Sequence, residues 1–209
     1  VSFNDEYFKD IQGYNRLMLD SVFYKQLLNY KYILIHQLDA FVFKDELTEW
    51  CNRGINYIGA PWMRKKEYPN VFKAIISRGL QYLAKRYDIK KRGLPSKKQF
   101  DNNVGNGGFS LRKVQSFYQI CIEEREKIAE YNKKITHHYN EDAFWAIEVN
   151  RKKKVLNIPG YKTALQFAFE LAPERSYCIN HQQLPFGCHA WDLYTDFWRP
   201  IFKEYGYDI

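Results

Sequence analysis

A short apolar run that ends near a carboxylate is the feature that most constrains the fold of this chain. Residues 32–35 read Tyr-Ile-Leu-Ile, and a run this short and rich in β-branched residues is typical of a strand buried on both faces. Asp39 follows shortly after. Because open α/β sheets bind ligands at the carboxyl ends of their strands, Asp39 is placed to hold Mg²⁺ or Mn²⁺, and through the ion a diphosphate. A second interpretation, in which Asp39 only caps a turn, stays open.

Helical and strand-like patterns alternate along the rest of the chain. Apolar residues at helical spacing predict helices over 14–30 and 114–135, whereas 57–62 and 154–158 have the composition of strands. Strands that alternate with helices are typical of α/β proteins. We therefore expect one domain over 1–209, built on a mixed, mostly parallel sheet that is flanked by helices.

The positive charge of the chain is concentrated in one segment. The 209 residues include 32 Lys and Arg against 24 Asp and Glu, which gives a formal net charge of +8. Twelve basic and two acidic residues lie between Arg64 and Lys98, so this segment carries +10 and the rest of the chain −2. Apolar residues at roughly helical spacing predict a basic helical insertion over 63–100. We expect four of its aromatic residues to lie partly in the core: Tyr68, Phe72, Tyr82 and Tyr87.

Three interpretations of the basic segment 64–98 stay open. The simplest is a solvated helix face. The second is a nucleic-acid-binding module, in which the basic side chains neutralise phosphates; nucleic acid is the partner that we expect least. The third is contact with anionic lipid or with an acidic acceptor.

The cysteines and the hydropathy of the chain indicate its compartment. The four cysteines form no CxxC pair and no close cluster, which is typical of free thiols in a reducing compartment. No apolar run approaches the roughly 20 residues needed to cross a bilayer. We expect a cytoplasmic protein, with peripheral contact at the inner membrane face through 64–98.

Two further motifs are candidates for chemistry, and each has a structural alternative. The loop 106–108 reads Asn-Gly-Gly and lets the backbone approach a hydroxyl-rich ligand, although glycines before a strand often only form turns. Glu141 and Asp142 precede Trp145. One of these carboxylates is a candidate general base beside an aromatic wall, but adjacent carboxylates at a helix start also act as caps.

His189 and Trp191 form the last motif. A neutral imidazole can bind a metal or a diphosphate, and an indole ring can stack on a sugar. A single histidine among aromatic residues is more often a hydrogen-bonded core residue, so both interpretations stay open.

The order of these motifs resembles a bacterial family of proposed glycosyltransferases with the A-type (GT-A-like) fold, long catalogued as a domain of unknown function. The resemblance covers about residues 14 to 202. It rests on five motifs: Tyr-Asn-Arg-Leu-Met at 14–18, Gln-Leu-Asp-Ala-Phe-Val-Phe at 37–43, Asn-Gly-Gly-Phe-Ser-Leu-Arg at 106–112, Glu-Asp-Ala-Phe-Trp at 141–145 and Phe-Gly-Cys-His-Ala-Trp at 186–191.

The resemblance implies that a hexosyl group passes from a nucleotide-sugar donor to a hydroxyl of a glycan or lipid-linked acceptor, in the synthesis of a surface polysaccharide or other glycan. It implies that Asp142 is the base of an inverting displacement and that Glu141 holds an acceptor hydroxyl. Gln37 and Asp39 would bind the donor, and His189 would complete the metal shell around Asp39. The acceptor side would be lined by Asn106, Gly107, Gly108, Trp145 and Trp191.

The chain departs from the A-type pattern at two places. The metal-binding Asp-x-Asp triplet is matched by Gln37, Leu38 and Asp39, so only Asp39 keeps a carboxylate for Mn²⁺ or Mg²⁺. A strand-helix-strand unit for the nucleotide usually precedes this triplet, whereas the residues before Tyr32 read as helix. We expect that unit on a segment before Val1; the alternative is incomplete donor binding. A metal-dependent hydrolase that uses Asp39, Glu141, Asp142 and His189 is the alternative enzyme class.

Overall fold

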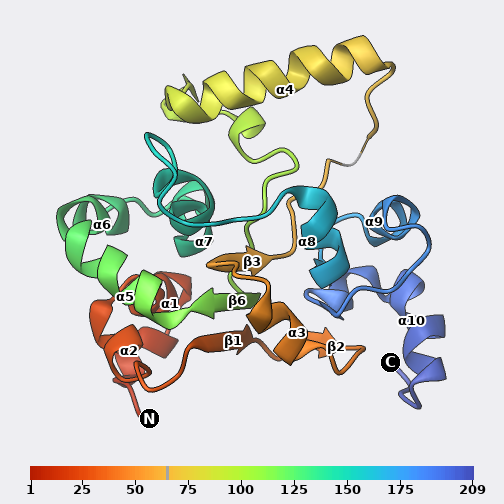
Figure 1. Cartoon of the computed structure of the whole chain (residues 1–209), viewed down its shortest axis with the longest axis horizontal. Coiled ribbons are helices and arrows are strands. Elements are labelled where there is room, and N and C mark those ends of the chain that lie inside the picture. Colours follow the sequence, from red (N-terminus) through yellow and green to blue (C-terminus); the bar gives the residue numbers. More distant parts are fainter. Residues whose placement is uncertain (65) are drawn as a thin grey trace.

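The structure is a computed structural model that describes residues 1–64 and 66–209, so Lys65 of the predicted insertion lies outside the described residues. Helices cover two small sheets (Figure 1). The helices are α1 (Ile11–Met18), α2 (Ser21–Lys25), α3 (Leu47–Asn52), α4 (Val71–Arg86), α5 (Val114–Glu123), α6 (Arg125–Asn132), α7 (Glu141–Ala143), α8 (Tyr161–Phe167), α9 (Pro173–Ile179) and α10 (Thr195–Glu204). The strands are β1 (Tyr32–His36), β2 (Phe41–Val42), β3 (Tyr57–Gly59), β4 (Lys90–Lys91), β5 (Leu94–Pro95), β6 (Phe109–Lys113), β7 (Ala168–Phe169) and β8 (Gly187–Cys188). Shorter elements include the 3₁₀ turn η2 (Lys97–Gln99) and the π-helical turn η4 (Phe144–Glu148).

The strands of the two three-stranded sheets run mostly antiparallel, and β4 and β5 form a third, two-stranded antiparallel sheet. The first sheet has the order β1-β6-β3, and both of its pairs are antiparallel. The second sheet has the order β2-β8-β7 and joins an antiparallel pair, β2 and β8, to a parallel pair, β7 and β8. The mixed α/β class is confirmed, but the prediction of a mostly parallel sheet is wrong.

The insertion explains why β3 and β6 are antiparallel. Pro61, just after β3, forms an antiparallel bridge with Val104, just before β6. The Trp62 N–H donates to the Asn103 carbonyl at 2.9 Å. The chain between them therefore leaves and re-enters the sheet at one point, as a long hairpin loop does, and a hairpin makes its two strands antiparallel. This loop carries α4, which projects from the body at the top of Figure 1.

The strand predicted at 32–35 is confirmed, but its burial is lower than expected. β1 lies at the end of its sheet, and within the described residues it pairs with β6 alone. Ile33 and Ile35 pack on one face of the sheet, whereas Tyr32 and Leu34 pack on the other. These four side chains are half-buried rather than fully buried.

Both long helices that the periodicity predicts are interrupted. The stretch 14–30 contains α1 and α2: α1 ends at Met18, and Asp20 caps the start of α2 by accepting the Val22 N–H at 2.8 Å. The stretch 114–135 contains α5 and α6, separated at Glu124. The strand predicted at 154–158 is absent from the described structure, where an Asn150 side chain instead bonds the backbone of this loop.

Two features bear on the predicted cellular compartment of the protein. The cysteines in the described residues are free thiols: Cys51, Cys121, Cys178 and Cys188. In the part of the chain that the structure describes, no helix is both long and apolar enough to pass through a bilayer.

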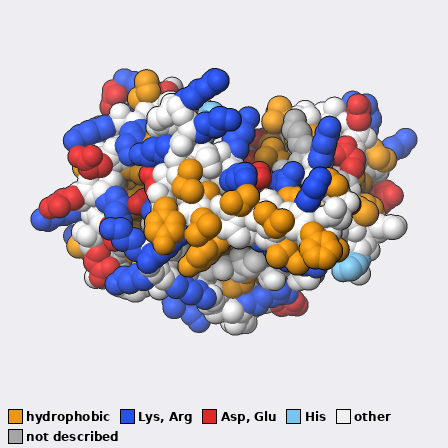
Figure 2. Space-filling model, turned by 90° about the horizontal axis from the view of Figure 1, so that it is seen from above, with side chains coloured by type: hydrophobic (Ala, Val, Ile, Leu, Met, Phe, Trp, Pro, Cys, Tyr) orange, Lys and Arg blue, Asp and Glu red, His pale blue; other side chains and the backbone are white. Residues whose placement is uncertain are grey.

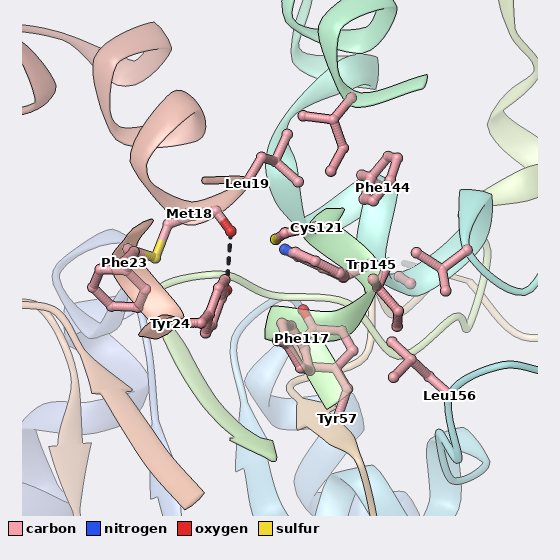
Figure 3. Packing of buried hydrophobic residues seen from close by; sticks show 14 of the residues in the cluster. Met18, Leu19, Phe23, Tyr24, Tyr57, Phe117, Cys121, Phe144, Trp145 and Leu156 are labelled. Carbon is pink, nitrogen blue, oxygen red and sulfur yellow. Dashed lines mark hydrogen bonds between the residues drawn. The ribbon is translucent and has the colours of Figure 1, made fainter. Parts of the chain in front are cut away.

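Aromatic rings fill the core on one face of the first sheet. Tyr24, Phe117 and Trp145 are fully buried, and the rings of Phe117 and Trp145 are 4.3 Å apart (Figure 3). On the other face, Trp50 of α3 packs edge-on against Phe167 of α8. Trp145 therefore belongs to the core, and the prediction that it lines an acceptor site is wrong because none of its side chain is exposed.

Arg112 crosses the same core as a fully buried cation. Its guanidinium donates to the Tyr24 hydroxyl at 2.9 Å, to Glu141 Oε1 at 3.1 Å and to Ser110 Oγ at 3.0 Å. Burial opposes the charge of Arg112, but the Glu141 carboxylate together with Tyr24, Tyr14 and Tyr57 outweighs burial and holds the pKa of Arg112 well above its ordinary value. This ion pair links the first sheet to α7.

We predict that Arg112→Met destabilises the fold by about 3–5 kcal/mol, because it leaves the Glu141 carboxylate buried without its cation. Urea unfolding followed by circular dichroism measures the loss. Arg112→Met/Glu141→Gln should be more stable than Arg112→Met alone, since the double variant buries no charge. A double variant that is no more stable than the single one would show that Glu141 is not held as an ion by Arg112.

Candidate functional site

His189 is the centre of a polar cluster where the two sheets meet. Its Nε2 lies 3.1 Å from Gln37 Oε1 and 3.3 Å from Asp39 Oδ1. Its Nδ1 lies 3.0 Å from Asn106 Nδ2 and 3.3 Å from Glu170 Oε1. The structure thus brings four of the predicted site residues together and adds a fifth, Glu170.

Strand register places these side chains. In the antiparallel pair, His36 is opposite Phe109, so Gln37 at the end of β1 meets Gly108 at the start of β6, and the Gln37 N–H donates to the Gly108 carbonyl at 2.9 Å. β7 and β8 run parallel, and their carboxyl ends meet at one edge of the second sheet. Glu170 follows β7 and His189 follows β8, which makes them neighbours.

The two glycines of the loop 106–108 serve side chains of the protein itself. Both are buried, so the prediction that they line an acceptor site is wrong. A Cβ on Gly107 would overlap Glu141 Oε1, and a Cβ on Gly108 would overlap His189 Nε2. The missing side chains let Glu141 and His189 approach the backbone closely.

Asn106 is also buried, and it bonds to the protein rather than to an open surface. Its Oδ1 accepts the Phe109 N–H at 2.7 Å, which turns its Nδ2 toward His189. A neutral His189 accepts this bond at Nδ1, whereas a protonated His189 donates from Nδ1 to Glu170. Burial lowers the pKa of His189, but Glu170 and Asp39 outweigh burial and raise it above its ordinary value.

Glu141 is held rigidly inside the protein. Its N–H donates to Asn15 Oδ1 at 3.1 Å, and Asn15 Nδ2 donates to Asn140 Oδ1 at 3.1 Å. Its carboxylate is buried against Arg112; burial raises the pKa of Glu141, and Arg112 opposes that rise. Glu141 therefore positions the start of α7. The prediction that Glu141 holds an acceptor hydroxyl is wrong, because its side chain is buried.

Asp142, the next residue, lines a pocket. The pocket has a volume of about 380 Å³ and lies between the insertion and the body of the protein. Burial, then Glu141 and Glu170, raise the pKa of Asp142 to about 8. The lining residues are Trp62, Met63, Lys97, Phe100, Asp101, His137, His138, Asn140, Asp142, Ala143 and Leu171. Directly after α7 the chain forms η4, and π-helical turns are frequent at functional sites.

Trp191 is half-buried beside the cluster. Its ring packs on Phe202 of α10 with the centroids 5.4 Å apart, and the Trp191 backbone N–H donates to the Asp39 carbonyl at 3.4 Å. Trp191 therefore supports the turn that carries Asp39. Its contact with an acceptor stays a prediction.

Reasoning from sequence misses Glu170, Asn15 and the aromatic walls of the pocket. Glu170 follows a buried apolar run at 167–169, the same pattern that identifies Asp39 after 32–35, so a signal for it exists. The pocket walls come from segments far apart in the chain, and no local pattern marks them.

The metal-binding capacity of the cluster is limited. Among residues 1–64 and 66–209, no group of three or more His, Cys, Asp or Glu side chains has the arrangement of a metal site. Asp39 and His189 supply two ligand atoms, and Gln37 adds an amide oxygen. Glu170 Oε2 is buried with no hydrogen-bond partner among the described residues.

The fold and the site define a mixed α/β protein with a carboxylate–histidine cluster beside a pocket. Residues 1–189 match the model of the family described as Protein of unknown function (DUF5672), and the chain belongs to this family. No curated protein and no solved structure matches the chain.

We predict that Gly108→Ala displaces the His189 ring while the fold is kept, because the new methyl group meets movable side-chain ends rather than backbone. The cost in stability should be about 1–3 kcal/mol. The chemical shifts of the His189 ring report its displacement. Gly79→Ala in α4 is the matched control, since no atom of the described residues lies within 4 Å of its added Cβ. Equal His189 shifts in both variants would show that Gly108 does not make room for the His189 ring.

A second prediction concerns pH and stability. Asp142 keeps its proton up to about pH 8 in the folded state and loses it near pH 4 when unfolded, so the folded state binds the extra proton between these values. Stability that is present below pH 4 is therefore lost as pH rises to 8, by up to about 1.4 kcal/mol per unit. Asp142→Asn should remove this loss and be more stable than wild type at pH 8.

Urea unfolding at several pH values measures this effect. Asp196→Asn is the control, because Asp196 is fully exposed and its charge is solvated in both states. If Asp142→Asn and Asp196→Asn follow the same stability profile between pH 4 and 8, Asp142 does not hold a proton in the folded protein.

Proposed function

We propose that this protein is a nucleotide-sugar-dependent glycosyltransferase that acts in the synthesis of a surface polysaccharide or other glycan. The observation that carries the proposal is the position of Asp142, which lines the pocket and is coupled electrostatically to Glu170 of the His189 cluster. A transferase needs a donor on one side of its base and an acceptor hydroxyl on the other. The motif order that resembles A-type enzymes supports the same assignment.

The donor side is assigned to Gln37, Asp39 and His189. The Asp39 and Gln37 oxygens lie within 3.3 Å of His189 Nε2, about the spacing of neighbouring ligands around a small divalent ion. Gln37, Asp39 and His189 would hold Mg²⁺ or Mn²⁺, and a diphosphate and water would complete the ligand set. A bound ion supplies charge neutralisation for the diphosphate leaving group.

The acceptor side is assigned to the pocket. Trp62 and Phe100 provide aromatic surface, and His138 and Asn140 provide polar groups, a composition that suits a sugar ring with its hydroxyls. Ionised Asp142 removes the proton of the acceptor hydroxyl as the hydroxyl oxygen bonds to the anomeric carbon of the donor sugar. The bond from that carbon to the diphosphate oxygen breaks, and its electron pair stays on the diphosphate.

Two measurements test these roles separately. Calorimetry with UDP and with GDP, each with Mn²⁺, should detect binding to wild type and at least about tenfold weaker binding to Asp39→Ala. Nucleotide release from UDP- and GDP-sugars in the presence of oligosaccharide acceptors should fall about 10²–10⁴-fold in Asp142→Asn. Asp142→Asn should still bind the nucleotide, because Asp142 contacts the acceptor.

Asp196→Asn is again the control, since this fully exposed carboxylate lies outside the assigned residues. Equal nucleotide release from wild type, Asp39→Ala and Asp142→Asn would overturn the roles. Transfer of the sugar to water with every acceptor tested would favour the hydrolase interpretation instead.

A further inference from the structure

α4 turns its apolar face to the solvent. The residues of this helix that lie against the rest of the protein are small or polar: Ala74, Ser77, Gln81, Ala84 and Lys85. The large apolar side chains are 42–78% exposed: Val71, Phe72, Ile75, Ile76, Leu80 and Leu83. A helix that packs on a protein core shows the reverse arrangement. The prediction that the aromatic residues of this segment lie partly in the core is wrong for Phe72, Tyr82 and Tyr87.

Polar contacts hold α4 in this orientation. Ser77 Oγ and Gln81 Nε2 donate to the Tyr68 hydroxyl at 2.9 and 2.8 Å. Lys85 Nζ donates to Asn103 Oδ1 at 3.0 Å, where the insertion rejoins the sheet. These bonds fix the polar side of the helix inward, so the apolar side must face outward.

Basic side chains border the apolar face. At 3.6 residues per turn, Lys73 and Arg78 fall on its two opposite edges. At the carboxyl end of α4, Arg86 and the exposed residues Lys152–Lys154 line a cleft of about 380 Å³. Figure 2 looks down on this side of the molecule and shows a band of apolar side chains with Lys and Arg around it.

We propose that α4 docks on an anionic lipid bilayer, with its apolar side chains at the boundary between headgroups and acyl chains. The exposed basic side chains at the border of this face, Lys73, Arg78 and Lys152–Lys154, contact lipid phosphates. An amphipathic helix with this combination of large apolar and basic residues binds bilayers through buried apolar area together with attraction to anionic lipid. This inference is independent of the glycosyltransferase assignment.

The charge of the segment favours lipid over the other occupants of an apolar face. A second copy would bring two segments of +10 together, and like charges across an interface oppose association. Nucleic acid would use the basic side chains but would leave the aliphatic Val71, Ile75 and Ile76 in water. Only a surface that is both anionic and apolar just beneath satisfies the two sets of side chains.

Co-sedimentation with vesicles tests the proposal. Wild type should bind vesicles that mix phosphatidylglycerol with phosphatidylcholine and should bind vesicles of phosphatidylcholine alone much more weakly. Ile75→Ser/Ile76→Ser should weaken binding to the mixed vesicles at least about tenfold, because it removes two large apolar side chains from the buried face. Lys73→Gln/Arg78→Gln should weaken binding as well. The difference between this variant and wild type should become smaller at high salt, because salt screens the attraction to anionic lipid.

Ile11→Ser/Ile135→Ser is the matched control, since both side chains are highly exposed and lie outside the insertion. This variant should sediment like wild type, and all three variants should keep the wild-type melting temperature. Quenching by brominated lipid should be stronger for Phe72→Trp than for Ile135→Trp.

Four results would overturn the proposal. The first is equal sedimentation of wild type with charged and neutral vesicles, and the second is full binding by Ile75→Ser/Ile76→Ser. The third is a dimer in solution that Ile75→Ser/Ile76→Ser dissociates, which would assign the face to a second copy. Tight binding to DNA with a steep salt dependence, without any binding to vesicles, would assign it to nucleic acid.

Discussion

The ion pair between Arg112 and Glu141 is the interaction on which the geometry of the site depends. Moving both charges out of water costs several kcal/mol, and this cost is offset only where every donor is used. Arg112 meets that condition with bonds to Tyr24, Ser110 and Glu141, which join α2, β6 and α7, and with further bonds to Met18 Sδ and the Gly107 carbonyl. Asn15 fixes the same helix start from α1. Because Glu141 is locked on both sides, the position of the next residue is locked as well.

Two adjacent carboxylates consequently have different chemistry. The Glu141 carboxylate has a cation at 3.1 Å, and the Glu141 backbone N–H donates to Asn15 Oδ1, so Glu141 acts as a structural ion. Among the described residues, Asp142 forms no ion pair, although its Oδ1 accepts the Ala143 N–H at 2.7 Å. Its neighbours Glu141 and Glu170 are both acidic, and they add to the effect of burial on its pKa. Environments that separate the pKa values of neighbouring acids are typical of acid–base catalysis. The buried core and the pKa of Asp142 are therefore linked through the single turn of α7.

The features that the sequence predicts well are those with a local signal. The apolar run at 32–35 and the helical spacing of the insertion are sufficient to place β1 and α4. Strand direction is not local, because it is set by the pairing of Pro61 with Val104 at the two ends of a long insertion. The role of Gly108 is not local either. A Cβ at this position would overlap the His189 ring, and His189 lies far along the chain. An aromatic residue beside a carboxylate motif, such as Trp145, gives no indication of whether it faces a ligand or the core.

The same limit applies to α4, the helix that relates the proposed membrane contact to the pocket beside Asp142. Periodicity identifies the apolar face of a helix but not the direction in which that face points, which here depends on hydrogen bonds to Tyr68. The insertion that carries α4 also supplies Lys97 and Phe100 to the pocket beside Asp142. Docking of α4 on a bilayer would therefore hold the pocket near the membrane surface. A charge of +10 on this one segment, against −2 on the rest of the chain, would direct that face and no other toward anionic lipid.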